Sequence, residues 1–285
     1  MSLRTYLQLV RFPGIFTVFS NVLLGFFVVQ QITYDWVSLV FLLGTSSFLF
    51  FAGMIFNDFF DFNIDKKQRP ERPLPSGKIS KNNALIMGLC FLVSANIFSA
   101  LVGFPSLLVS LGMTGFILLY NVKLKNIPIM GILNLSVIRF FNVILGTTIV
   151  AISIDVIQIA LPVAILVAGI SILAKSEVSQ YSKGTEILNL IFIVSTIFYV
   201  NLLAFGGEII FYPFIVLFVI IIFVSFYFYK ESTQKNIQKK VTFQLLSIII
   251  LDASLLALYS ELIFALLTLI LFVPAYFVTR KMYLT

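Results

Sequence analysis

Long apolar stretches alternate with short polar segments along almost the whole chain. About 20 apolar residues in helical conformation cross the hydrocarbon core of a membrane, since each residue adds about 1.5 Å to a helix. The pattern predicts nine or ten membrane-spanning helices, because the last two stretches are short and are either separate or one irregular element. The predicted spans lie near residues 13–31, 36–57, 84–103, 105–121, 128–151, 157–174, 187–205, 210–229, 242–259 and 261–279.

Composition supports an all-α integral membrane protein with a single domain over residues 1–285. The chain is 60% hydrophobic and 11% charged, whereas a soluble domain is usually about half apolar and a quarter charged. Histidine is absent and Cys90 is the only cysteine. The sequence therefore excludes a disulfide framework, an imidazole base and a zinc site of the usual ligands.

Charge predicts how the helices are oriented. If the chain threads alternately, one side carries only the acids Asp35, Asp155, Glu208 and Glu261. The opposite side receives Arg4, Arg11, the basic cluster at 66–81, Lys123, Lys125, Lys175, Lys183, Lys230, Lys235, Lys239, Lys240, Arg280 and Lys281. By the positive-inside rule the basic side is cytoplasmic. We expect a multi-pass protein of the cell (cytoplasmic) membrane with its N-terminus and polar loops inside. The net charge of +7 then reflects topology and lipid contact rather than nucleic-acid binding.

Two ionisable residues, Arg139 and Asp252, fall near the middle of predicted spans. A charge at this depth costs at least about 2.5–3.5 kcal/mol, so it normally faces the protein interior and finds a partner. One interpretation is a buried ion pair between Arg139 and Asp252 that fixes helix packing. The other places Arg139 in a polar cavity that receives an anion, with Asn142 on the same helical face.

The segment "NDFFDFNIDKKQRPERPLPSGKIS" at 57–80 concentrates charge at the end of the second span. If the helix continues past Asn57, Asp58, Asp61 and Asp65 share one face. Three carboxylates so close repel one another unless a cation lies among them, and hard oxygen ligands suit Mg²⁺. We predict Asn57 and the three aspartates as metal ligands.

Basic residues follow at once, among them Lys66, Arg69 and Arg72. Arginine binds phosphate oxygens bidentately and lysine acts as a point charge. Acids for Mg²⁺ followed by bases for phosphate indicate a diphosphate site. The helix should end by Gln68 or Arg69 because the prolines that follow cannot continue it, and the proline-rich segment would form a lid-like loop. A solvated cytoplasmic loop is the alternative, but it does not explain the acids.

This segment resembles the first aspartate-rich motif of the UbiA superfamily of intramembrane prenyltransferases (4-hydroxybenzoate polyprenyltransferase-like), NDxxDxxxD followed by a basic stretch and RPLPSG. The matching residues are Asn57, Asp58, Asp61, Asp65, Arg69, Arg72, Pro73, Pro75, Ser76 and Gly77. The resemblance implies a ring of helices around a central cavity with a cytoplasmic cap, over essentially the whole chain. It also implies catalytic loops at 57–82, 120–126 and 175–186.

Further residues enter through the same resemblance. "YNVKLK" is similar to a family segment in which a lysine binds diphosphate, which implies that Tyr120 binds substrate and that Lys123 is catalytic. Without the resemblance, Lys123 and Lys125 would be interpreted as charges that only set the membrane topology. "RFFNVILG" resembles the family's fifth span and supports a catalytic Arg139 and a substrate-binding Asn142. Asn21 in the first span is assigned to substrate binding as well.

The second aspartate-rich motif of the family is degenerate here. The corresponding loop reads "LAKSEVSQYSKGTE", in which Glu177 is the only acid of the first half. We predict Glu177 as a metal-binding and catalytic residue, with Lys175 or Lys183 replacing the charge of a second cation. "SEV" in this loop and "LDA" in a late span resemble a divergent bacterial branch of the superfamily.

The implied function is an Mg²⁺-dependent intramembrane prenyltransferase. It would ionise a prenyl diphosphate and transfer the prenyl group to a lipophilic or aromatic acceptor. Two alternatives remain: a UbiA-type terpene cyclase or lyase that quenches the cation internally, for which aromatic rings would stabilise charge, and a non-catalytic isoprenoid-binding membrane protein. Chain length of the prenyl group, acceptor and oligomeric state are left open.

Overall fold

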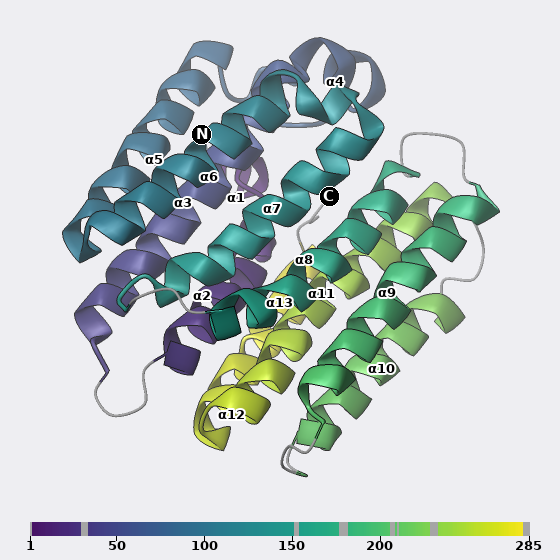
Figure 1. Ribbon diagram of the computed structural model, residues 1–285. Helices are drawn as coiled ribbons and strands as arrows, with labels where there is room; N and C mark the ends of the chain where they lie inside the picture. The colour runs from purple at the N-terminus through teal and green to yellow at the C-terminus, as the bar shows by residue number, and fades with distance from the viewer. Residues whose placement is uncertain are drawn as a thin grey trace.

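A computed structural model describes residues 2–29, 34–150, 154–176, 182–205, 209, 211–228 and 233–281. Within these ranges the regular structure is entirely helical (Figure 1). The helices are α1 (Leu3–Leu9), α2 (Ile15–Val29), α3 (Trp36–Phe60), α4 (Phe62–Gln68), α5 (Lys81–Val102), α6 (Phe104–Val122), α7 (Pro128–Thr147), α8 (Ile154–Lys175), α9 (Lys183–Leu203), α10 (Phe211–Phe228), α11 (Gln234–Tyr259), α12 (Leu262–Ile270) and α13 (Phe272–Lys281). Two short 3₁₀ turns, η1 (Phe12–Gly14) and η2 (Leu124–Asn126), precede α2 and α7.

Nine helical segments among the described residues are long and apolar enough to cross a membrane, and α10 is a shorter apolar helix. The prediction of nine or ten spans is confirmed, and each predicted span corresponds to a helix. The last predicted span consists of two pieces, α12 and α13. Pro274 lies in the first turn of α13, and a proline ring clashes with the carbonyl four residues earlier, here that of Ile270. This explains why α12 ends at Ile270.

The helix that precedes this pair, α11, is longer than predicted. It begins at Gln234 rather than near residue 242, and the Thr233 hydroxyl caps it by accepting from the Asn236 N–H. Its first turns include Lys240, which is 3% exposed, pairs with Glu186 of α9 and lies over the ring of Phe226. The polar residues of this segment are thus part of the packed bundle rather than of a loop.

The helices pack in a closed circuit. The α3 helix contacts α5 and α6, α6 contacts α7, α7 contacts α8, and α11 contacts both α8 and α2, which returns to α3. In the ribbon, α3, α5 and α6 lie to one side of α2, and α9 and α10 to the other (Figure 1). One large hydrophobic core extends through this arrangement.

The two inner helices α2 and α7 cross at very short range. A Cβ on Gly25 would lie 2.1 Å from the Val143 carbonyl oxygen, and one on Gly146 would lie 2.3 Å from the Val22 carbonyl oxygen. Only glycine allows such an approach of two backbones in a membrane bundle. The crossing brings polar side chains one turn away on both helices, Asn21 and Asn142, into the same layer.

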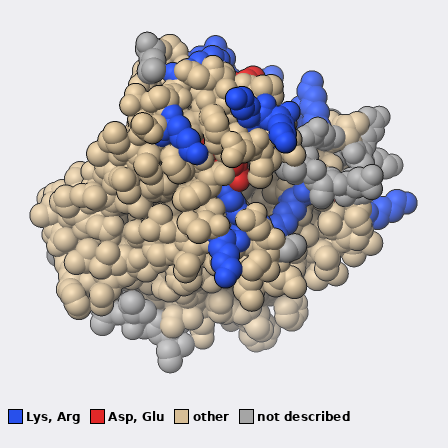
Figure 2. Space-filling view, turned by 90° about the horizontal axis from the view of Figure 1, so that it is seen from above, with Lys and Arg blue, Asp and Glu red and all other residues tan. Residues whose placement is uncertain are grey.

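The face that carries the polar loops is basic. Lys and Arg side chains gather there around a depression in which acidic atoms are visible (Figure 2). Beneath this face a small second core joins α1 to the loop after α4, through Leu9, Val10, Ile55, Leu74 and Ile79.

Candidate active site

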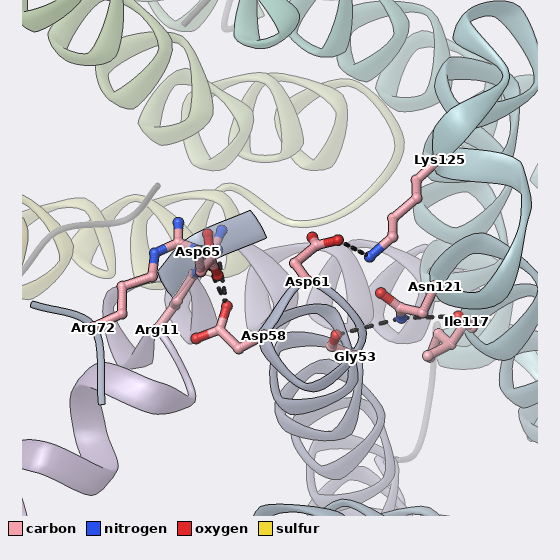
Figure 3. Close-up of polar contacts among 9 residues, drawn as sticks. All are labelled: Arg11, Gly53, Asp58, Asp61, Asp65, Arg72, Ile117, Asn121 and Lys125. Atoms are coloured by element: carbon pink, nitrogen blue, oxygen red, sulfur yellow. Dashed lines mark hydrogen bonds and ion pairs between the residues drawn. The ribbon is translucent and has the colours of Figure 1, made fainter. Parts of the chain in front are cut away.

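The aspartate-rich segment is not one continuous helix. The α3 helix ends at Phe60, and Asp61 (φ −86°, ψ 4°) turns the backbone before α4 begins. The expectation that Asp58, Asp61 and Asp65 share one helical face is therefore wrong. The turn separates Asp61 from the other two carboxylates, as Figure 3 shows. The predicted end of the helical segment at Gln68 is confirmed.

Asp58 and Asp65 converge on one arginine. Arg72 Nη1 lies 3.3 Å from Asp58 Oδ1 and 2.7 Å from Asp65 Oδ2. A second guanidinium approaches the same oxygen of Asp58, since Arg11 Nη2 lies 3.4 Å away. The two carboxylates are nearly buried, with side chains 4% and 6% exposed. One oxygen of each carboxylate thus lies within 3.3 Å of the same cationic nitrogen, Arg72 Nη1.

Asp61 has a different partner. Lys125 Nζ, from η2, lies 2.6 Å from Asp61 Oδ1 (Figure 3). Lys123, which the sequence favoured, is exposed at the end of α6. Sequence reasoning treated Lys125 and Arg11 mainly as topogenic charges and so missed two residues of the site. Their position beside the acids depends on turns that carry no clear sequence signal.

The loop that supplies Arg72 is anchored. Leu74 and Ile79 are 2% and 1% exposed and pack into the second core. The loop closes through hydrogen bonds from Ile79 N–H to the Pro73 carbonyl (3.1 Å) and from Gly77 N–H to the Leu74 carbonyl (3.0 Å). Gly77 has φ 73°, a conformation that glycine adopts without strain. The proline-rich segment is therefore a packed cap in this structure.

Arg11 has the only positive φ among the described non-glycine residues, at 46°. A left-handed conformation costs a residue with a Cβ roughly 1–2 kcal/mol. The turn lies between α1 and η1, and the neighbours Leu9 and Val10 are buried. Packing of α1 thus holds the strained turn and directs the guanidinium toward Asp58.

The electrostatics of Asp65 follow from its position. Burial raises the pKa of Asp65, and the nearby Arg72 guanidinium offsets part of that rise. The negative charges of Asp58 and Asp61 also raise the pKa of Asp65. Asp65 therefore takes up a proton more readily than an exposed aspartate.

Other predicted residues surround this group. Asn57 lies one turn before Asp61 and accepts its N–H through the backbone carbonyl (3.0 Å). Tyr120 lies near the end of α6, just before the turn that carries Lys125. Next to it, Asn121 donates to the Ile117 carbonyl (2.9 Å), and its buried Oδ1 accepts no hydrogen bond.

The remaining predicted residues of this site are Lys66, Arg69 and Glu177. Lys66 is exposed on α4, and Arg69 follows that helix with its N–H donating to the Asp65 carbonyl (2.8 Å). Glu177 lies outside the described residues. In the part of the chain that the structure describes, no three carboxylates are grouped as a metal site: Asp58 and Asp65 contact Arg72, whereas Asp61 contacts Lys125.

A second polar network lies inside the bundle. Arg139 donates to Asn21 Oδ1 (3.2 Å) and to Thr17 Oγ1 (3.1 Å). Asn21 Nδ2 in turn donates to Asp252 Oδ2 (2.7 Å). Of the two interpretations of Arg139, the direct ion pair with Asp252 is not what the structure shows, because the Asn21 amide lies between the two charges.

Asn142 belongs to the same layer, as the sequence predicted. Its Nδ2 donates to the Val18 carbonyl (2.9 Å), and Ser46 of α3 donates to its Oδ1. The network thus joins α2, α3, α7 and α11, and Asp252 Oδ1 is left without a hydrogen bond.

Fold and site define an all-helical membrane protein whose basic face holds a cluster of aspartates. The chain belongs to the UbiA prenyltransferase family, whose model matches residues 18–249. Among curated proteins, a digeranylgeranylglyceryl phosphate synthase of Thermococcus sibiricus is 39% identical over 33% of this chain and 34% of its own length. The matched part of the chain thus spans about a third of that relative.

Solved structures share the fold over a much longer range. A structure of a digeranylgeranylglyceryl phosphate synthase is 21% identical, covers 94% of this chain and 98% of its own, and has a TM-score of 0.66. A UbiA homologue of Archaeoglobus fulgidus, bound to GPP and Mg²⁺, is 17% identical, covers 88% and 99%, and has a TM-score of 0.67. At these identities the likeness concerns the fold.

Proposed function

We propose that this chain is an Mg²⁺-dependent prenyltransferase that acts on a prenyl diphosphate at the basic face. The observation that carries the proposal is the convergence of Asp58 Oδ1 and Asp65 Oδ2 on one cationic atom of Arg72, within the family's aspartate-rich motif. Carboxylate oxygens that already meet around a positive charge are a donor set suited to Mg²⁺. The solved homologue that is bound to GPP and Mg²⁺ supports a prenyl diphosphate and Mg²⁺ as the molecules that this site binds.

The residues divide by chemistry. The metal would be held by Asp58 and Asp65, whose oxygens converge on one point, and would neutralise charge that develops on the leaving diphosphate. Asn57 and Asp61 stay predicted metal ligands. Arg11, Arg72 and Lys125 are the bases beside these acids and would bind the diphosphate oxygens. Arg69, Lys66, Lys123, Tyr120 and Glu177 stay predicted contributors.

In the proposed reaction the C1–O bond of the prenyl diphosphate breaks and the diphosphate leaves with the electron pair. The acceptor nucleophile forms the new bond to C1 and loses its proton. Bases held by ion pairs and an anchored loop are in place before the reaction, which favours charge stabilisation. The surrounding apolar helices would receive the prenyl tail and exclude water. We further propose that the basic face is cytoplasmic and that the membrane is the cell membrane.

For the acceptor we propose a lipid-like molecule. The name of the matched relatives supports a glyceryl phosphate compound, and an aromatic acid is the other class to test. The test supplies protein in lipid nanodiscs with prenyl diphosphates of several lengths, with and without Mg²⁺ and each acceptor. Prenylated acceptor is the predicted product. A cyclic or linear terpene without acceptor would favour the cyclase, and no diphosphate release at any chain length would refute catalysis.

A further inference from the structure

Each carboxylate of the aspartate-rich segment already has a cationic partner in the structure. Asp58 contacts Arg11 and Arg72, Asp65 contacts Arg72, and Asp61 contacts Lys125. These four contacts join three acids to three bases, so this cluster of six side chains is electrically neutral when all three aspartates are ionised. The residues assigned to the metal and those assigned to the diphosphate thus bind one another when both ligands are absent.

The contacts lie in a weakly solvated place. The side chains of Arg72 and Lys125 are 13% and 12% exposed, and that of Asp58 is 4% exposed. Salt screens such pairs much less than exposed ones, and a buried charge that loses its partner is costly. A change at one member of the cluster therefore affects the others.

Binding of a single ligand would leave half of the cluster without partners. A divalent cation alone must displace Arg72 Nη1 from Asp58 and Asp65, and the displaced guanidinium then faces added positive charge. Diphosphate alone would draw the bases away and leave carboxylates beside an anion. With both ligands present, acids hold the cation, bases hold the anion, and every charge has a partner.

We propose that Arg11, Arg72 and Lys125 are internal counter-cations of the site, which Mg²⁺ and diphosphate replace in one coupled exchange. Neither ligand binds tightly without the other. This rests on the proposed function, because it assumes that the site takes a diphosphate. It assigns Arg11 and Lys125 two alternating partners, a carboxylate in the free protein and phosphate oxygens in the loaded one.

The test is equilibrium binding to the full chain in lipid nanodiscs. Mn²⁺, detected by electron paramagnetic resonance, reports the cation, and inorganic diphosphate serves as the anion, with correction for their complex in solution. For the wild type we expect saturating diphosphate to tighten Mn²⁺ binding by about tenfold or more. By linkage Mn²⁺ tightens diphosphate binding by the same factor.

Variants give the sharper result. Arg72→Gln and, for the separate pair with Asp61, Lys125→Gln should each tighten Mn²⁺ binding in the absence of diphosphate, by about tenfold. Both should weaken diphosphate binding in the presence of Mn²⁺. Lys67→Gln is the matched control, since Lys67 is exposed on α4 and the ion pairs of the three aspartates are with Arg11, Arg72 and Lys125. It removes the same charge and should change Mn²⁺ affinity little.

Two results would overturn the exchange while leaving the proposed function intact. One is wild-type Mn²⁺ affinity that is equal with and without diphosphate. The other is unchanged or weaker Mn²⁺ binding in both Arg72→Gln and Lys125→Gln. If the wild type binds neither inorganic nor prenyl diphosphate at any Mn²⁺ concentration, the proposed function itself falls. Because two separate ion pairs are tested, misfolding of one variant leaves the other to decide.

Discussion

Arg72 contacts two carboxylates from different helical segments, and this contact organises the polar end of the protein. The loop that carries Arg72 is fixed by Leu74 and Ile79 in the second core. Hydrophobic burial thus sets the position of a charged group. Because the acids and bases are largely shielded from water, their interactions are stronger than those of exposed pairs.

The pH dependence of stability should reflect Asp65. Its pKa is raised by burial, so the folded protein keeps a proton there at pH values where the unfolded chain has lost it. The resulting stabilisation is complete below the ordinary aspartate pKa, about 4, and is lost as the pH rises through the raised value. The melting temperature of the metal-free wild type should therefore fall relative to Asp65→Asn across that window. A constant or oppositely changing difference would contradict this.

For individual residues, the sequence predicted that acids and bases lie together in one site, but it did not predict every acid–base contact. The acids and Arg72 were identified from the motif. The contact of Asp61 with Lys125 was not, because it depends on the turn at Asp61 and on the short η2 helix. A shift of one or two residues in such a turn changes which lysine reaches the acid.

Between elements, the backbones of α2 and α7 approach each other closely at Gly25 and Gly146. This crossing can be tested by substitution. A methyl group at residue 146 would collide with the Val22 backbone oxygen. Gly146→Ala should therefore separate the helices and destabilise the protein by about 1–3 kcal/mol, the usual range for overpacking. Gly115→Ala in α6 is the control, since nothing lies within 4 Å of its added Cβ. Equal melting temperatures of both variants in detergent would contradict the predicted crossing.

The hydrogen bonds from Arg139 to Asn21 and from Asn21 to Asp252 connect three helices, α7, α2 and α11. Arg139 and Asp252 are joined through the Asn21 amide, and removing one of two buried opposite charges leaves the other uncompensated, at a cost of about 3–5 kcal/mol. Arg139→Leu and Asp252→Leu should each lower stability strongly, and the double variant should lose less than the sum. Thermal unfolding of the four proteins measures this coupling. Equal losses of activity in single and double variants, with stability retained, would indicate that Arg139 acts on the substrate instead.

Helix positions were largely predictable, since a helix lies in each of the ranges that apolar length predicted. The start of α11 was not, because Lys240 is buried against Glu186 and Phe226, partners that lie far away in the sequence. The break at Leu271 was missed for a different reason: Pro274 was read as part of a uniform apolar stretch, although a proline limits the helix before it.

For the whole molecule, orientation in the membrane follows from charge. The basic face of Figure 2 should be cytoplasmic. In a Cys90→Ser background, Lys67→Cys should react with an impermeant thiol reagent only after the membrane is opened. Glu261→Cys, on the opposite side, should react in intact cells. The reverse pattern would contradict the proposed topology.

The most direct test of the central claim follows diphosphate release by the purified protein in lipid. Wild-type protein given prenyl diphosphates should release diphosphate only with Mg²⁺. Asp58→Asn and Asp61→Asn should lower the rate by about a hundredfold or more, as expected for loss of a group that stabilises the transition state, while both stay folded in the membrane. Lys67→Gln should retain the wild-type rate. Undiminished, Mg²⁺-dependent release by both aspartate variants would contradict the account, because the diphosphate would then be ionised elsewhere.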